Sequence, residues 1–255
     1  MQDCLRTRGF LPVADPDTRL TLGERFEWLD QLGHDLPSLL LEPDCRTYLQ
    51  HQPIPDWPHP NIPPALLPQA RLFYLRLGFL ASGYINQVGQ PTTHVLPANI
   101  ARPLCQIAQL LDRPPMLSYD GYALYNWKRF DSEKPVQLGN IDTLQNFVHL
   151  YDEHWFILVH VEIEALAARI YGAIEDLKVG DKFTDGDAVD NCLLQMGGAL
   201  DKILAVLRRI PERMSDELYF SHFRPYIGQF KNVTYESIGQ VVSFRGETGA
   251  QSSMM

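Results

Sequence analysis

The feature that most constrains this fold is the segment of residues 154–177, H-W-F-I-L-V-H-V-E-I-E-A-L-A-A-R-I-Y-G-A-I-E-D-L. It contains no proline and its single glycine comes late, so it predicts a long helix. The first three turns are apolar on nearly every side, which is typical of a helix inside the core. At about 100° per residue, one stripe of this helix carries Phe156, His160, Ile163, Ala167, Tyr171 and Ile174.

An ionisable imidazole, His160, lies in the middle of that stripe. Burying a polar ring without a partner costs a few kcal/mol, so we expect His160 to have a partner or to face a cavity or ligand. Two interpretations stay open: a core histidine bonded to a backbone carbonyl, or a ring that serves a site. A nonhaem metal site is poorly supported, because neither H-x-x-x-H nor E-x-x-H accompanies this residue.

Composition and charge narrow the class of protein. With 255 residues, 45% hydrophobic and 21% charged, the chain suits one large or two smaller globular domains. The net charge of -9 disfavours nonspecific binding to nucleic acid or to anionic membranes, although it leaves room for a local basic pocket. The amino terminus does not resemble a signal peptide, no apolar run could span a bilayer, and the four scattered cysteines favour reduced thiols. We therefore expect a cytoplasmic protein without nucleic-acid or membrane partners.

Periodicity along the chain predicts an all-α protein. Besides the central helix, apolar spacing predicts helices over residues 21–32 (stopped at Leu36-Pro37), 70–87, 100–111, 141–150, 188–210 and 214–226. Seven prolines in residues 52–68 predict an extended connector. Strand-like alternation appears only at residues 240–244. Small residues within 70–87 would permit close approach of another helix or of a flat ligand.

Three further segments could carry chemistry. Residues 219–231, Y-F-S-H-F-R-P-Y-I-G-Q-F-K, place one arginine among five aromatic rings, which would suit an aromatic carboxylate or, alternatively, a cation–π contact outside a helix. The aromatic residues of 117–127 suit a core or a pocket wall. Residues 245–253, R-G-E-T-G-A-Q-S-S, could bind an anionic group or form a solvent loop.

Several of these pieces, in order, resemble the indoleamine 2,3-dioxygenase family of haem proteins. The matching pieces are V-L-P-A-N-I-A-R-P (95–103), R-P-P-M-L-S-Y-D-G-Y-A-L-Y-N-W-K (113–128), N-I-D-T-L (140–144), F-I-L-V-H-V-E-I-E-A (156–165), F-R-P-Y-I-G-Q-F-K (223–231) and G-A-Q-S-S (249–253). They cover roughly residues 70–255, which makes the resemblance more specific than any single motif.

The resemblance implies a helical fold of two domains with haem b between them: a small amino-terminal domain, residues 1–147, over a larger domain, residues 148–255. It implies an enzyme that inserts O2 across the indole C2–C3 bond of L-tryptophan, or of a related indole, to give N-formylkynurenine. It leaves the oligomeric state and the preferred indole open.

The resemblance also assigns roles to residues. His160 matches the distal position; a histidine there resembles the distal histidine of tryptophan 2,3-dioxygenases, which bonds the indole N–H, whereas vertebrate members have Ser or Thr. Arg224 matches the arginine that holds the substrate carboxylate. The substrate-binding positions are Tyr119, Tyr122, Ala123, Phe156, Tyr219, Phe220, Arg224 and Thr248. The haem-edge positions are Gly246, Thr248 and Gly249.

One departure concerns the iron ligand. In the family the proximal histidine follows the A-Q-S-S segment on a later helix, but this sequence stops at Met255. We expect a fragment of a longer protein, with no metal ligand within the chain. Two alternatives to the dioxygenase stay open: a haem enzyme of secondary metabolism that rearranges a substituted tryptophan, and a haem- or indole-binding protein without turnover.

Overall fold

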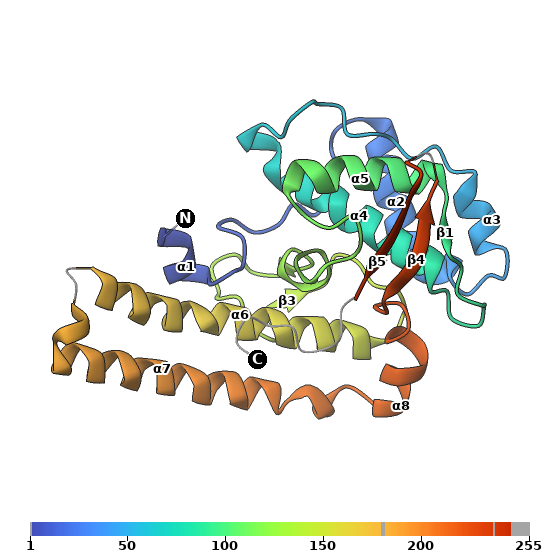
Figure 1. Ribbon diagram of the computed structural model, residues 1–255. Helices are drawn as coiled ribbons and strands as arrows, with labels where there is room; N and C mark the ends of the chain where they lie inside the picture. The colour runs from blue at the N-terminus through green and yellow to red at the C-terminus, as the bar shows by residue number, and fades with distance from the viewer. Residues whose placement is uncertain (1, 180–181, 237, 246–255) are drawn as a thin grey trace.

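The computed structural model describes residues 2–179, 182–236 and 238–245. The chain is mostly helical, which confirms the predicted class (Figure 1). The helices are α1 (Gln2–Arg8), α2 (Glu24–Leu39), α3 (Cys45–Gln50), η1 (Pro64–Leu66), α4 (Leu67–Ile85), α5 (Ala98–Leu111), η2 (Asp120–Leu124), α6 (Tyr151–Lys178), η3 (Lys182–Thr184), α7 (Gly186–Leu207), η4 (Ile210–Glu212), α8 (Asp216–Leu218) and η5 (Tyr219–Phe223). Within the described ranges, no helix is long and apolar enough to cross a membrane.

The predicted central helix is α6, and it pairs with α7 in a long hairpin (Figure 1). Their shared core is a separate apolar cluster. It contains Trp155, Val159, Ile163, Ala167 and Ile170 of α6, spaced three or four residues apart, against Ala199, Ile203 and Val206 of α7. Another side of α6 packs against α1 and η2. Because two sides of α6 are covered, its early turns have no polar face, as the sequence predicts.

The other core surrounds α4, which is buried along almost its whole length. The small residues of α4 admit neighbouring leucine side chains. A Cβ atom at Gly78 would lie 3.1 Å from Leu117, and one at Gly83 would lie 3.1 Å from Leu40. These glycines therefore serve close packing rather than a flat ligand. This larger core draws on residues from Leu11 to Tyr235, and the expected domain division at residue 147 stays a prediction.

A small sheet joins distant parts of the chain. Strand β1 (Val95–Leu96) pairs in parallel with β4 (Phe230–Tyr235), which pairs antiparallel with β5 (Gln240–Phe244). Strand β5 confirms the alternation at residues 240–244. The sequence missed β4, because a bulge breaks its register between Phe230 and Val233, and Asn232 has a φ of 51°.

Two helix predictions were wrong at their boundaries. Helix α2 continues through Pro37 instead of stopping before it. Proline at this position cannot donate to the carbonyl of Gly33, but the Gln145 side chain donates to that oxygen instead, at 2.6 Å. The predicted helix at 214–226 is shorter, with helical turns only in α8 and η5.

A helix was also predicted at residues 141–150, and this was wrong. The segment begins with β3 (Ile141–Asp142), which pairs with β2 (Lys128–Arg129), and continues as a loop. Side chains take up the backbone N–H groups of the loop: the Asn126 carbonyl oxygen accepts from residues 144 and 145, and the Glu153 carboxylate accepts from residues 147 and 148. Such bonds replace the i to i−4 ladder that a helix needs.

Candidate functional site

His160 lies in the third turn of α6 and is 2% exposed. Its Nδ1 lies 2.7 Å from the carbonyl oxygen of Phe156. A carbonyl oxygen can only accept, so Nδ1 carries the proton in this bond. Burial lowers the pKa of the imidazole, which keeps the ring neutral near pH 7. The remaining nitrogen, Nε2, then has a free lone pair and acts as a hydrogen-bond acceptor.

That second nitrogen has no partner among the described residues, although it is buried. Unsatisfied buried polar atoms are uncommon and cost about 1–3 kcal/mol each. Both interpretations of His160 from the sequence therefore hold in part. One nitrogen bonds a backbone carbonyl as a core histidine does, and the other is left open to a ligand.

An apolar cavity adjoins this ring. It is lined by Tyr119, Tyr122, Ala123, Phe156, Ile157, His160 and Ile227. Five of these seven are residues that the sequence singled out, and the fold brings them together from η2 and α6. The cavity measures about 10 Å³, which is room for about one water molecule. An indole is much larger, so it could enter only if the surrounding rings moved apart.

Aromatic rings from two segments line the cavity, and Tyr219 from a third packs against Phe156 without lining it. The Phe156 ring lies 4.5 Å from the His160 ring, between centroids, and the Tyr119 ring meets His160 edge-on at 6.3 Å. From η5, the Tyr219 ring lies 5.4 Å from Phe156. Rings held by different elements can separate without unfolding any of them, which suits a site that opens for a flat ligand.

Phe220 of η5 and Arg224, which directly follows η5, take two different positions. Phe220 is 68% exposed and packs edge-on against Tyr219, so its side chain does not line the cavity. Arg224 is half-buried, and its Nη1 donates to the carbonyl oxygen of Ile227 at 3.4 Å. Ile227 lines the cavity, and Arg224 does not line it but bonds to Ile227. The π-helical bond from Arg224 N to Tyr219 O (2.9 Å) sets this placement.

Two buried glutamates support the tyrosines, and the sequence analysis gave neither of them a role. The Tyr119 hydroxyl donates to Glu164 Oε1 at 3.2 Å, and the Tyr122 hydroxyl lies 3.5 Å from Glu153 Oε1. Both glutamates are fully buried. Glu164 follows His160 by four residues, and that spacing could have placed it on the His160 face. No local signal marks Glu153.

Burial raises the pKa of Glu153 to about 8. The hydrogen bonds from backbone N–H groups lower this pKa, but by less than burial raises it. Its Oε2 accepts from the N–H groups of Phe147 and Val148, at 2.8 and 3.0 Å. Glu153 therefore ties the loop before α6 to a tyrosine of the cavity wall.

The predicted positions Gly246, Thr248 and Gly249 lie outside the described residues. Within the part of the chain that is described, no three histidine, cysteine or acidic side chains gather in a way that could hold a metal ion.

Comparisons with known proteins identify what the chain is similar to. Residues 3–255 match the family model described as indoleamine 2,3-dioxygenase. Indoleamine 2,3-dioxygenase of Saccharomyces cerevisiae is 29% identical over 97% of this chain and 57% of its own length. Indoleamine 2,3-dioxygenase 1 of Rattus norvegicus is 28% identical over 68% of this chain and 46% of its own length. A myoglobin of Haliotis madaka is 25% identical over 97% of this chain and 64% of its own length. The chain thus spans about half the length of the first two relatives.

Proposed function

The chain belongs to the indoleamine 2,3-dioxygenase family, and on that basis we propose that the protein takes part in haem-dependent dioxygenation of an indole. The proposed reaction inserts both atoms of O2 across the indole C2–C3 bond of L-tryptophan, or of a related indole, and gives N-formylkynurenine. The observation that carries the proposal is the buried His160, whose acceptor nitrogen faces an aromatic cavity without a partner among the described residues.

The site residues suit one face of a haem group. The walls are apolar rings, and the only unsatisfied polar atom among the described cavity residues is an acceptor, so the chemistry of the lining suits a flat apolar group that carries an N–H donor. A porphyrin cannot lie inside a cavity of about 10 Å³; these residues would form one wall of its site. His160 as an axial ligand would occupy the face that O2 needs. Haem iron, when bound, supplies the binding and activation of O2.

In this proposal His160 positions the substrate. Nε2 accepts a hydrogen bond from the indole N–H, which determines which edge of the ring faces the oxygen. Phe156 and Tyr119 hold the two faces of the ring after they separate. Glu164 supports Tyr119 from behind through the hydroxyl bond. The proton on Nδ1 stays with the Phe156 carbonyl, so the acceptor state of Nε2 is maintained.

Arg224 is proposed to pair with the substrate carboxylate. Its Nη1 donates to the carbonyl oxygen of Ile227, a residue that lines the cavity, so the guanidinium lies close to the cavity edge. A charge-assisted bond of this kind contributes about 1.5–3 kcal/mol. Gly246, Thr248 and Gly249 remain the proposed contacts to the haem edge and to the substrate amine.

The first test uses His160→Ala in protein purified from haem-replete cells. We expect a Soret band that shifts with CO in both wild type and variant, and a loss of tryptophan turnover of about 10- to 100-fold in the variant. His51→Ala is the matched control, because His51 Nδ1 also bonds the carbonyl four residues earlier, at 2.7 Å, but on the surface. Unchanged turnover in His160→Ala would remove His160 from this role.

The second test asks whether Arg224 binds the carboxylate of the substrate rather than its indole ring. Arg224→Ala should raise KM for L-tryptophan by roughly tenfold or more, while indole derivatives without a carboxylate are spared. Arg208→Ala, an exposed arginine at the end of α7, controls for the loss of one positive charge. An equal effect on both classes of substrate would exclude Arg224 as the carboxylate partner.

The relatives named myoglobin favour a second candidate, haem binding without turnover. Spectra alone do not distinguish it, since both candidates predict a Soret band that responds to CO. Product analysis does: N-formylkynurenine supports the dioxygenase, a rearranged tryptophan supports the secondary-metabolism alternative, and a stable oxygen complex without product supports the binding protein.

A further inference from the structure

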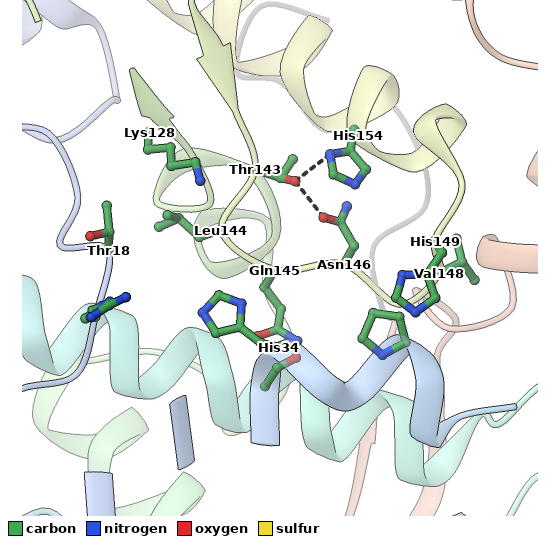
Figure 2. Close-up of a pocket in the computed structure, with 13 residues that line it drawn as sticks. Thr18, His34, Lys128, Thr143, Leu144, Gln145, Asn146, Val148, His149 and His154 are labelled. Carbon is green, nitrogen blue, oxygen red and sulfur yellow. Dashed lines mark hydrogen bonds between the residues drawn. The ribbon is translucent and has the colours of Figure 1, made fainter. Parts of the chain in front are cut away.

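A second hollow lies away from the aromatic cavity and is much larger. It has a volume of about 480 Å³ and is open to the surface. Its walls come from the segment before α2, from α2 itself, from β2, from the loop after β3 and from the start of α6. Figure 2 shows Lys128 on one side, His149 and His154 on the other, and His34 of α2 between them. The volume lies within the range of about 300–1,000 Å³ that small-molecule sites occupy.

The charge of this pocket is opposite to that of the whole chain. Its described lining contains two cations, Arg19 and Lys128, and three imidazoles, but no aspartate or glutamate. The chain as a whole has a net charge of -9. A concave, single-sign lining concentrates the electrostatic potential that attracts an oppositely charged ligand.

Two carboxylates beside this lining have cationic or imidazole partners, whereas Asp17 and Asp35, also beside it, bond among the described residues only to the side chains of Gln69 and Gln31. Asp142 lies 3.0 Å from Nδ1 of His154, and Asp30 accepts from the buried Arg76 at 2.8 and 2.9 Å. His34 lies near the same pair, where burial and the Arg76 charge lower the pKa of its imidazole. Arg19 and Lys128 have no carboxylate within ion-pair distance among the described residues. Asp142 lies opposite Lys128 across the β2–β3 pair, so Lys128 is not isolated from negative charge, but within the described ranges neither cation is in a salt bridge that a ligand would have to break.

The pocket wall is held in place before any ligand arrives. Thr143 hydrogen-bonds to Asn146 (2.5 Å) and to His154 Nδ1 (2.9 Å), as the dashed lines in Figure 2 show. His149 Nε2 bonds to Ser38 at 2.9 Å. No partner is recorded within the described ranges for the other nitrogen of either ring. Nδ1 of His154 donates to the Asp142 carboxylate, so Nε2 of that ring donates to an anion only when the ring is protonated. Groups fixed in advance lose little conformational entropy when a ligand binds.

From this geometry we propose that the pocket binds a small anion with two or more negative groups, either carboxylates or phosphates. Lys128 pairs with one group, and Arg19 with the imidazoles of His149 and His154 receives the others. The loop that supplies Thr143 also supplies the N–H groups that bond Glu153, which supports Tyr122 of the aromatic cavity. The anion site and the aromatic cavity therefore share one loop. The binding proposal stands independently of the dioxygenase proposal.

The test is an isothermal calorimetric titration of the protein at low ionic strength, with pyrophosphate in one experiment and citrate in another. We expect saturable binding of at least one probe. Lys128→Ala should weaken binding by about 3- to 10-fold, because the substitution removes a half-buried ammonium group that pairs with one negative group of the ligand. Lys128→Arg keeps the charge and should keep most of the affinity. Added salt should weaken binding in the wild type more than in Lys128→Ala.

Lys202→Ala is the matched control, since Lys202 is an exposed lysine on α7 that does not line this pocket. We expect it to change the affinity by less than about twofold. Tighter binding of pyrophosphate assigns a phosphate ligand, and tighter binding of citrate assigns a carboxylate ligand; either supports the proposal. No saturable binding of either probe, or an equal loss in Lys202→Ala and Lys128→Ala, would overturn it.

Discussion

Arg76 of α4 and His160 of α6 are both buried polar side chains on core helices, but the fold treats them in opposite ways. The Nε and Nη2 atoms of Arg76 donate to Asp30 Oδ1 at 2.9 and 2.8 Å, and Nη1 donates to Leu144 O at 2.9 Å and to Gln145 Oε1. His160 has one nitrogen bonded and the other without a partner among the described residues. Arg76 is fully satisfied by the fold, whereas His160 leaves one nitrogen open beside a cavity.

The surroundings of the two residues explain the difference. Arg76 joins α4, α2 and the loop after β3, so each of its bonds holds two segments together. His160 bonds only within its own helix and otherwise faces apolar rings. Removing Arg76 should therefore disturb several elements, whereas removing His160 should disturb almost none. The following predictions test this contrast.

The largest effect should come from Arg76→Met. The change leaves the buried Asp30 carboxylate without its cation, and breaking a buried pair in this way lowers the free energy of unfolding by about 3–5 kcal/mol. Urea denaturation measures it. Arg102→Met is the control, because the Arg102 pair with Asp56 is exposed and such pairs contribute about 0–1 kcal/mol. Equal losses of stability in the two variants would show that the buried bonds of Arg76 are not a special source of stability.

Glu153→Ala should come next. It leaves the buried N–H group of Phe147 without an acceptor, at about 1–3 kcal/mol, and the part-buried N–H group of Val148 without its acceptor at a smaller cost, because water can replace it. Glu153→Gln keeps one oxygen acceptor and should lose less. If the alanine variant were as stable as wild type, Glu153 would not be what holds the loop before α6.

The pH dependence of stability sharpens the same point. The pKa of Glu153 is raised in the folded protein, from 4.5 to about 8. The folded state then binds a proton that the unfolded state has released, so the stabilisation is complete below about pH 4.5 and is lost as the pH rises towards 8. The difference in free energy of unfolding between wild type and Glu153→Gln should change across this window. A constant difference from pH 5 to pH 8 would contradict the raised pKa.

The smallest effect on stability should come from His160→Phe, at less than about 1 kcal/mol in either direction. The variant removes an unsatisfied buried nitrogen, and replacing such a group by an apolar one is nearly neutral. The Phe156 carbonyl keeps its place in the α6 backbone ladder. Thermal unfolding checks this. A loss comparable to that of Arg76→Met would make His160 a structural residue like Arg76.

The long helices were predictable because their signals are local. The spacing of Trp155, Val159, Ile163 and Ala167 can be read within one segment, and α6 and α7 were found from that periodicity. The family resemblance named the residues of the aromatic cavity, and five of them line it. The exposed Phe220 shows that a matching position in sequence does not guarantee a place in the cavity wall.

Contacts between segments were not predictable. Helix α2 runs through Pro37 because a glutamine more than a hundred residues later bonds the carbonyl that proline leaves free. Residues 143–148 form a loop because Asn126 and Glu153 take up their N–H groups. No pattern within either segment signals these distant acceptors and donors.

The sequence by itself determined the helical class, the family, and the presence of an imidazole on the apolar stripe of α6, since each depends on residue order within a short stretch. Only the tertiary structure decided that Nδ1 of His160 is bonded while Nε2 is open, that the adjoining cavity has room for about one water, and that Lys128 and three histidines meet in a separate pocket. The physical reason is that hydrogen-bond satisfaction and charge are shared among atoms close in space, whatever their separation along the chain.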